Sequence, residues 1–259
     1  MPYRRLPNTD LARLRALNAT LKKGTQLSPV DLAFSQKSLI ELKSFFPHFE
    51  QTIFQYKNSR KRQSILGKLL QGESRSAKLY VSHFLQVVNF CILRGEFKPE
   101  IRSFYGIDES EKSVPEIGTE QQLIYWGEKL LSGEEKRTLT GATRIYNPSI
   151  AMVRVKYEKF LETYNLHKDI LNTSQKIQEK VNESRIQADR LISDLWNEIE
   201  ATFNDLPPEE KRLKCGEYGL VYFYRPSEKK DNERTISLPI IEDKSNSREI
   251  VNLLKASNL

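Results

Sequence analysis

The stretch from residue 149 to residue 206 contains neither glycine nor proline. Apolar or small side chains recur in it at intervals of three and four residues, which places them along one face of an α-helix. A second run with the same spacing begins at residue 32. We therefore predict an all-α protein whose helices bury these faces against each other. The positions are Leu32, Ser35, Leu39, Leu42, Phe46, Phe49, Ile53 and Tyr56 in one run, and Ile170, Ser174, Ile177, Val181, Ser184, Ala188, Leu191, Leu195 and Ile199 in the other.

The first run is interrupted after Tyr56, because the next positions of the pattern hold arginine, glutamine and glycine. Apolar spacing resumes near Leu66 and continues to Gly95, a residue type that commonly follows a helix end. Each long segment therefore reads as a helical hairpin, with its turn near Arg62 in the first and at residues 176–177 in the second. Two such hairpins form an antiparallel four-helix bundle with short accessory helices. The alternative is a continuous helix of about 56 residues, about 84 Å long.

The two halves of the chain carry similar signals in the same order. Thr9 and Thr119 can each cap a short helix, and residues 28–29 and 147–148 each place a proline in the first turn of a long one. The stretches PEIRSFYGI and PEEKRLKCGEYGL then share a proline-glutamate start and a Tyr-Gly-aliphatic end. We interpret this order as an internal duplication, with a first helical repeat over 1–107 and a second over 108–225. Residues 219–225 read as a short extended segment, and residues 226–259 as a charged tail.

Local signatures of catalysis are missing from the sequence. None of the three histidines follows a glutamate by three residues, the pattern that a di-iron helix bundle requires. There is no phosphate-binding loop ending in Gly-Lys-Ser/Thr and no Gly-x-Ser-x-Gly, and the two cysteines match no metal or redox spacing. We therefore predict no catalytic, cofactor-binding or metal-binding residues and no cofactor. An enzyme with a dispersed site leaves no such trace. We favour this hypothesis less than a non-catalytic scaffold or a nucleic-acid-binding protein.

Positive charge is concentrated near the start of the chain. Residues 1–75 contain 14 Lys and Arg against 5 Asp and Glu, whereas the whole chain has a formal net charge of +7. A basic surface attracts phosphates and binds nucleic acid in a salt-sensitive way. We interpret Arg4 and Arg5 as an exposed arm, and Arg13 and Arg15 as the outer flank of the first helix. The candidate nucleic-acid-binding residues are Arg4, Arg5, Arg13, Arg15, Lys22, Lys23, Arg60, Lys61 and Arg62.

The sequence favours a cytoplasmic protein with no membrane partner. Residues 1–5 have no apolar run behind them, so no secretory signal is expected. The most apolar stretch, residues 80–93, is too short and too polar to span a bilayer.

Several stretches resemble a family of uncharacterised bacterial helical proteins over about residues 1–225. They are MPYRRLPNTDLARLRAL, KLYVSHFLQVVNFCILRGEF, IYNPSIAMVRVKYEKFLETYN and CGEYGLVYFYR. The family has no assigned activity, so the resemblance implies a helical fold in a bacterial cytoplasm and no site residues. We expect a non-catalytic helical scaffold or adaptor that binds a protein partner or itself. The alternative is a protein associated with nucleic acid or ribonucleoprotein through the basic surface of residues 1–75.

Overall fold

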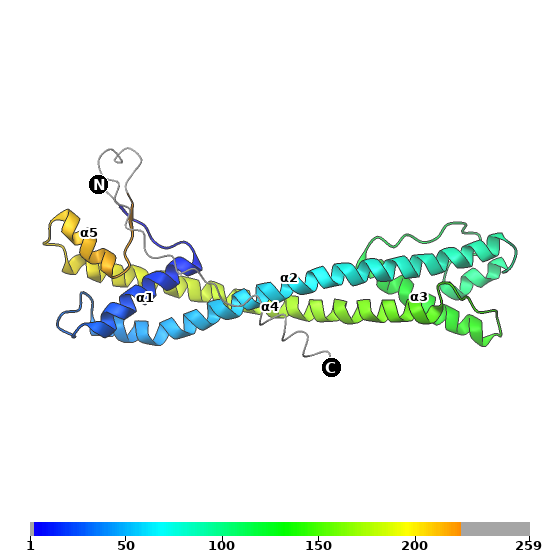
Figure 1. The fold of residues 1–259 in the computed structure, drawn as a ribbon, viewed down its shortest axis with the longest axis horizontal. Coiled ribbons are helices and arrows are strands. Elements are labelled where there is room, and N and C mark those ends of the chain that lie inside the picture. Colours follow the sequence, from blue (N-terminus) through cyan, green and yellow to red (C-terminus); the bar gives the residue numbers. More distant parts are fainter. Residues whose placement is uncertain (1–2, 224–259) are drawn as a thin grey trace. The chain divides into compact units, whose positions relative to one another are not determined.

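The computed structural model describes residues 3–223 and is mainly helical, which confirms the all-α prediction (Figure 1). No helix in this described range is long and apolar enough to cross a membrane. The predicted tail, residues 226–259, lies outside it. The elements are β1 (Tyr3–Arg4), α1 (Asp10–Gln26), α2 (Gln36–Leu93), the 3-10 helix η1 (Pro99–Tyr105), α3 (Glu120–Leu139), α4 (Ile150–Thr202), α5 (Pro208–Glu217) and β2 (Tyr222–Phe223).

The chain divides into two compact units, which are described separately. One contains Leu6–Gly219 and therefore all the helices of the described residues. The other includes residues 3–5 and 220–223, where β1 pairs antiparallel with β2. The short extended segment expected within residues 219–225 is present there as β2.

Helices α2 and α4 pack against each other in opposite directions along most of their length (Figure 1). At one end, Ser38 Oγ donates a hydrogen bond of 2.6 Å to Glu198 Oε1. Further along α2, Lys159 Nζ of α4 forms an ion pair of 3.0 Å with Glu73 Oε1. Residue numbers rise along α2 as they fall along α4, so this is an antiparallel helical pair.

The predicted hairpin turns are wrong. Arg62 lies inside α2, and residues 176–177 lie inside α4, with helix on both sides of each. The four-helix bundle built from two hairpins is therefore replaced by two continuous helices of 58 and 53 residues. Even Pro47 lies inside α2 without ending it. Neither predicted turn contains a glycine, a proline or a capping motif, which are the features that stop helices.

After Tyr56 the heptad repeat of α2 continues without a break, but polar residues occupy the positions that apolar residues hold elsewhere. Tyr56 and Leu70 are two heptads apart, so the apolar seam resumes in the same register. Among the intervening seam positions, Arg60 is exposed and Gln63 and Gly67 are half-buried. We define the waist as residues 54–69 of α2 and residues 164–180 of α4.

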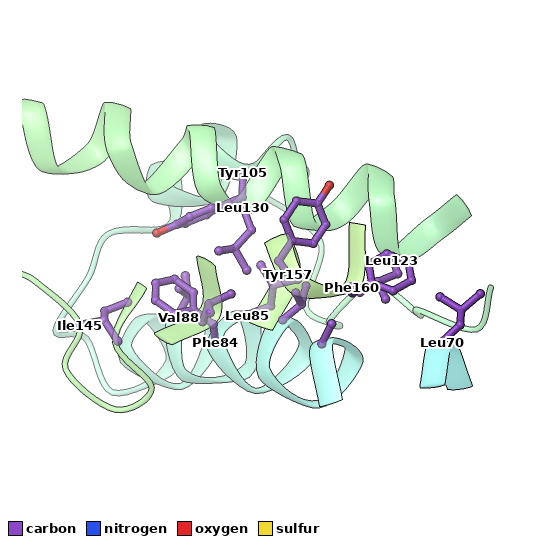
Figure 2. Packing of buried hydrophobic residues seen from close by; sticks show 13 residues of the cluster. Leu70, Phe84, Leu85, Val88, Tyr105, Leu123, Leu130, Ile145, Tyr157 and Phe160 are labelled. Carbon is purple, nitrogen blue, oxygen red and sulfur yellow. The ribbon is translucent and has the colours of Figure 1, made fainter. Parts of the chain in front are cut away.

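Large apolar cores lie on either side of the waist. The core at the α3 end gathers side chains from α2, η1, α3 and α4, as Figure 2 shows. Phe84 of α2 and Tyr105 of η1 meet edge to face there, with ring centroids 6.5 Å apart. At the other end, α1 and α5 cover the start of α2 and the end of α4, where Leu42 and Trp196 are almost fully buried. The waist joins these two cored ends.

The helix starts follow local capping chemistry. Helices α1 and α3 begin at the predicted threonine caps, and in α3 the cap forms a capping box with Gln122. The long helices begin later than expected, because the caps are Ser35 and Ser149 rather than the residues before the two prolines at 29 and 148. In each case the serine hydroxyl accepts a hydrogen bond from the backbone N–H three residues on.

We predict opposite effects from alanine at two helical glycines. A Cβ at Gly127 of α3 would lie 2.1 Å from the ring of Tyr157, whereas a Cβ at Gly72 of α2 would meet nothing within 4 Å. Overpacking costs about 1–3 kcal/mol, and alanine favours a helix by about 1 kcal/mol over glycine. Gly127→Ala should therefore lower the thermal midpoint measured by circular dichroism, and Gly72→Ala should raise it. Equal shifts for the two variants would contradict the packing of α3 on α4.

Candidate functional site

The first predicted cations lie in the smaller unit. Arg4 belongs to β1 and is paired in register with Tyr222 of β2. The guanidinium carbon of Arg5 lies 4.8 Å from the centroid of the Phe223 ring, a cation–π contact. Arg5 is exposed, as expected for an arm, and is anchored by a hydrogen bond from its N–H to the Val221 carbonyl.

Arg13 is engaged within the fold. Its Nε and Nη2 donate to the two carboxylate oxygens of Asp189 in α4, at 2.7 and 2.8 Å. The prediction that Arg13 lies on the outer flank of its helix is therefore wrong, because its side chain is 12% exposed. A second forked pair joins Arg185 of α4 to Asp10 of α1 at 2.8 and 2.7 Å. Its hydrogen bonds lower the pKa of Asp10. These two reciprocal pairs fix α1 on α4.

Lys22 and Lys23, at the end of α1, are separate from residues 60–62. Lys23 forms an ion pair of 2.6 Å with Glu217 of α5, whereas Arg15 and Lys22 are exposed. The end of α1 packs near the start of α2, because a Cβ at Gly24 would touch Leu39. Residue 60 lies 21 residues further along α2, which is about 32 Å. Within the unit of residues 6–219, the structure therefore does not gather the seven predicted residues into one surface.

Residues 60–62 lie on the waist, in a stretch of α2 whose charged residues are all basic. Arg60, Lys61 and Arg62 are exposed, and Arg60 Nη1 is 3.4 Å from Gln63 Oε1 of the next turn. Residues 54–69 contain five Lys and Arg and no Asp or Glu, whereas residues 164–180 of α4 contain three and two. Two members of this stretch, at positions 57 and 68, were not among the predicted residues. The sequence could have identified them through its continuous heptad repeat, because that repeat predicts one helix containing both of them and residues 60–62.

The side chains that are fully buried in the waist are polar. In residues 54–69 and 164–180 the buried side chains are Ser59 and Ser174, whose hydroxyls are 2.5 Å apart. The apolar seam residues Tyr56, Ile170 and Ile177 are half-buried, and five apolar side chains on other faces of the two helices are exposed. Their exposed fractions are 63% for Phe54, 42% for Ile65, 47% for Leu69, 49% for Leu166 and 39% for Leu171.

A hollow of about 680 Å³ lies where α3 begins beside the waist. Gly67 and Arg75 of α2, His167 of α4 and residues 118–121 line it. Lys78 closes one side by donating a hydrogen bond to the carbonyl oxygen of Gly118. The hollow lies at the place where α3 stops covering the α2–α4 pair.

A buried ionic cluster lies in the core at the α3 end. Arg137 donates two hydrogen bonds of 2.7 Å to the carboxylate of Glu134, and the Tyr105 hydroxyl donates a third of 2.5 Å. Arg137 and Glu134 are 0% and 2% exposed. Burial and the Glu134 carboxylate raise the pKa of Tyr105, so it stays a neutral donor. Arg137 Nη1 lacks a hydrogen-bond partner, and the guanidinium carbon lies 5.1 Å from the Phe97 ring centroid. This cluster fixes η1 to α3.

We predict that Glu134→Gln strongly destabilises the fold. Removing one partner of a buried ion pair costs about 3–5 kcal/mol, because the other charge is left uncompensated. The matched control is Glu135→Gln, an exposed neighbour on the same helix whose substitution should change stability by about 0.5 kcal/mol at most. Urea unfolding at neutral pH measures both. Similar midpoints for the two variants would contradict the burial of the cluster.

Among residues 3–223, no group of three or more His, Cys, Asp or Glu side chains could hold a metal ion. The two cysteines, Cys91 and Cys215, are buried and form no disulfide bond. The waist is the candidate site, because it combines exposed cations with exposed apolar side chains. The chain matches no protein-family model, no curated protein and no solved structure.

Proposed function

We propose that the chain is a helical scaffold or adaptor that associates with a protein through its waist. The observation that carries this proposal is the serine layer there: Ser59 and Ser174 are the fully buried side chains of the waist, whereas Phe54 and Ile65 on its outer faces are exposed. A two-helix pair gains little from a serine layer, since burial of apolar surface drives most helix packing. Exposed apolar side chains gathered on one region are typical of protein-binding surfaces.

The cytoplasmic location and the internal duplication belong to the same proposal. The order of short helix, long helix and short helix occurs twice, as α1, α2, η1 and as α3, α4, α5. Each repeat ends on a buried tyrosine followed by a glycine with positive φ, at residues 105–106 and 218–219. The repeats run antiparallel, so each short first helix covers a different end of the pair. This arrangement supports a scaffold with two similar ends and a distinct middle.

Site-specific photo-crosslinking in the cells that make the protein tests the association. Benzoylphenylalanine replaces Ile65 in the waist, or Leu79 as the control. Both are exposed positions of α2, and they are two heptads apart, so they share one helix face. We expect a discrete adduct from position 65 and none from position 79, whether the partner is another protein or a second copy. Absence of an adduct at position 65, or equal adducts at both positions, would contradict the proposal.

Nucleic-acid binding is a second candidate function, favoured by the five cations of residues 54–69. Affinity for duplex DNA or RNA should then fall steeply with salt, because bound phosphates release counterions. Arg60→Gln/Arg62→Gln should reduce the slope of log affinity against log salt by about 2. Lys136→Gln/Arg154→Gln removes the same charge from exposed positions outside the waist and should leave the slope unchanged. No retention on immobilised nucleic acid at low salt would exclude this function.

A further inference from the structure

Helices α1 and α3 cover the same face of the α2–α4 pair. On α4, Arg185 binds Asp10 of α1, and the Tyr157 hydroxyl donates a hydrogen bond of 2.8 Å to the Ile124 carbonyl oxygen in α3. Arg185 and Tyr157 are four heptads apart, so they hold the same position of the repeat. In a coiled coil, equal heptad positions face the same side.

Helix α2 gives the same result independently. Lys78 donates to the Gly118 carbonyl just before α3. Near the start of α1, the hydrogen bonds of Arg185 and, more weakly, the charge of Lys57 lower the pKa of Asp10, and Arg185 lies 5.4 Å from the ring centroid of Tyr56, the neighbour of Lys57. Lys57 and Lys78 are three heptads apart. Both short helices also begin at their ends nearest the waist and run away from it. They therefore lie in line on one face, and the stretch between their first residues is left uncovered by the described residues, 3–223.

We call this uncovered stretch the slot. It runs from the level of Arg185, where α1 begins, to the level of His167, which lines the hollow where α3 begins. These residues are 18 positions apart on α4, which corresponds to about 27 Å. A helix of 17 residues, the length of α1, has nearly the same length. The slot therefore has the length of one more short helix on a face that already accepts two.

The lining of the slot is basic with an apolar centre. Cations occupy it on both helices, and Leu171, 39% exposed, lies near its middle. The residues of α2 and α4 whose heptad positions face the slot include no Asp or Glu. The lining includes Lys57, Arg60 and Ser64 of α2 and Lys168, Leu171 and Gln175 of α4.

These features favour a protein helix over nucleic acid. The slot is closed at both ends by α1 and α3, so a long duplex lying along it would meet both helices. A helical segment of about 18 residues fits between them and can place leucines on Leu171 and glutamates beside the cations. Opposite charges across such an interface raise the association rate and fix the orientation of the ligand.

We propose that the slot binds an acidic amphipathic α-helix of a partner protein. This inference rests on the proposed function. It specifies which face of the waist binds the partner and the chemical character of that partner. The ligand helix takes the place of a third short helix in line with α1 and α3.

Fluorescence anisotropy with the full chain tests the proposal. The probe is a labelled 18-residue peptide of Glu, Ala and Leu, with its leucines at helical spacing and glutamates flanking them. A scrambled peptide of the same composition lacks the amphipathic face. We expect saturable binding of the first peptide only, weakened at least tenfold by Lys57→Glu/Arg60→Glu/Lys168→Glu. Lack of binding by the first peptide, or equal binding of the scrambled one, would overturn the proposal.

A second charge-reversed variant separates the slot from general electrostatics. Lys43→Glu/Lys136→Glu/Arg154→Glu changes the net charge equally at exposed positions outside the slot, and it should bind the peptide as the wild type does. Equal weakening in both triple variants would overturn the proposal, as would a 16-base-pair DNA duplex that displaces the peptide from the slot. If position 65 gives crosslinks in cells but the chain does not bind the peptide, this inference alone is overturned and the proposed function still holds.

Discussion

The continuous heptad register shared by α2 and α4 is the constraint on which the rest of the structure depends. Ser38 meets Glu198 near one end and Glu73 meets Lys159 beyond the middle, so the two helices stay in step over most of their length. This pairing creates the edges on which α1 and α3 pack. It also places Arg185 where it can bind Asp10, which anchors the first helix. A shift of register would remove the partners of all these groups together.

Local signals in the sequence predicted the helices well and their connectivity poorly. The threonine caps and the glycine after α2 were correctly placed, because capping depends on a few neighbouring residues. The hairpins were wrong because the polar residues Arg60 and Gln63 interrupt the apolar pattern without stopping a helix. Lysine, arginine and glutamine favour helix nearly as well as leucine does. Whether such a stretch turns back or continues depends on what it packs against, and that partner lies more than 100 residues away.

The basic stretch at residues 60–62 could be found from the sequence, since consecutive cations on a helix remain together. The role of Arg13 could not be found in this way. Its partner Asp189 is separated from it by 176 residues, and only the docking of α1 on α4 brings the two together. The same is true of the slot, whose two sides come from different long helices. Charge composition therefore identified the region, and tertiary pairing decided which cations are used inside the fold and which face solvent.

The serine layer between Ser59 and Ser174 also bears on how the chain unfolds. Each end of the helical pair has its own apolar core, whereas the segment between them contributes little buried apolar surface. Cooperativity requires that the loss of one part removes contacts from the next. Across this layer the fully buried contact is between two serines, so we expect each cored end to unfold as a separate foldon. The backbone hydrogen bonds of the middle segment then open and exchange with deuterated water before those of either end.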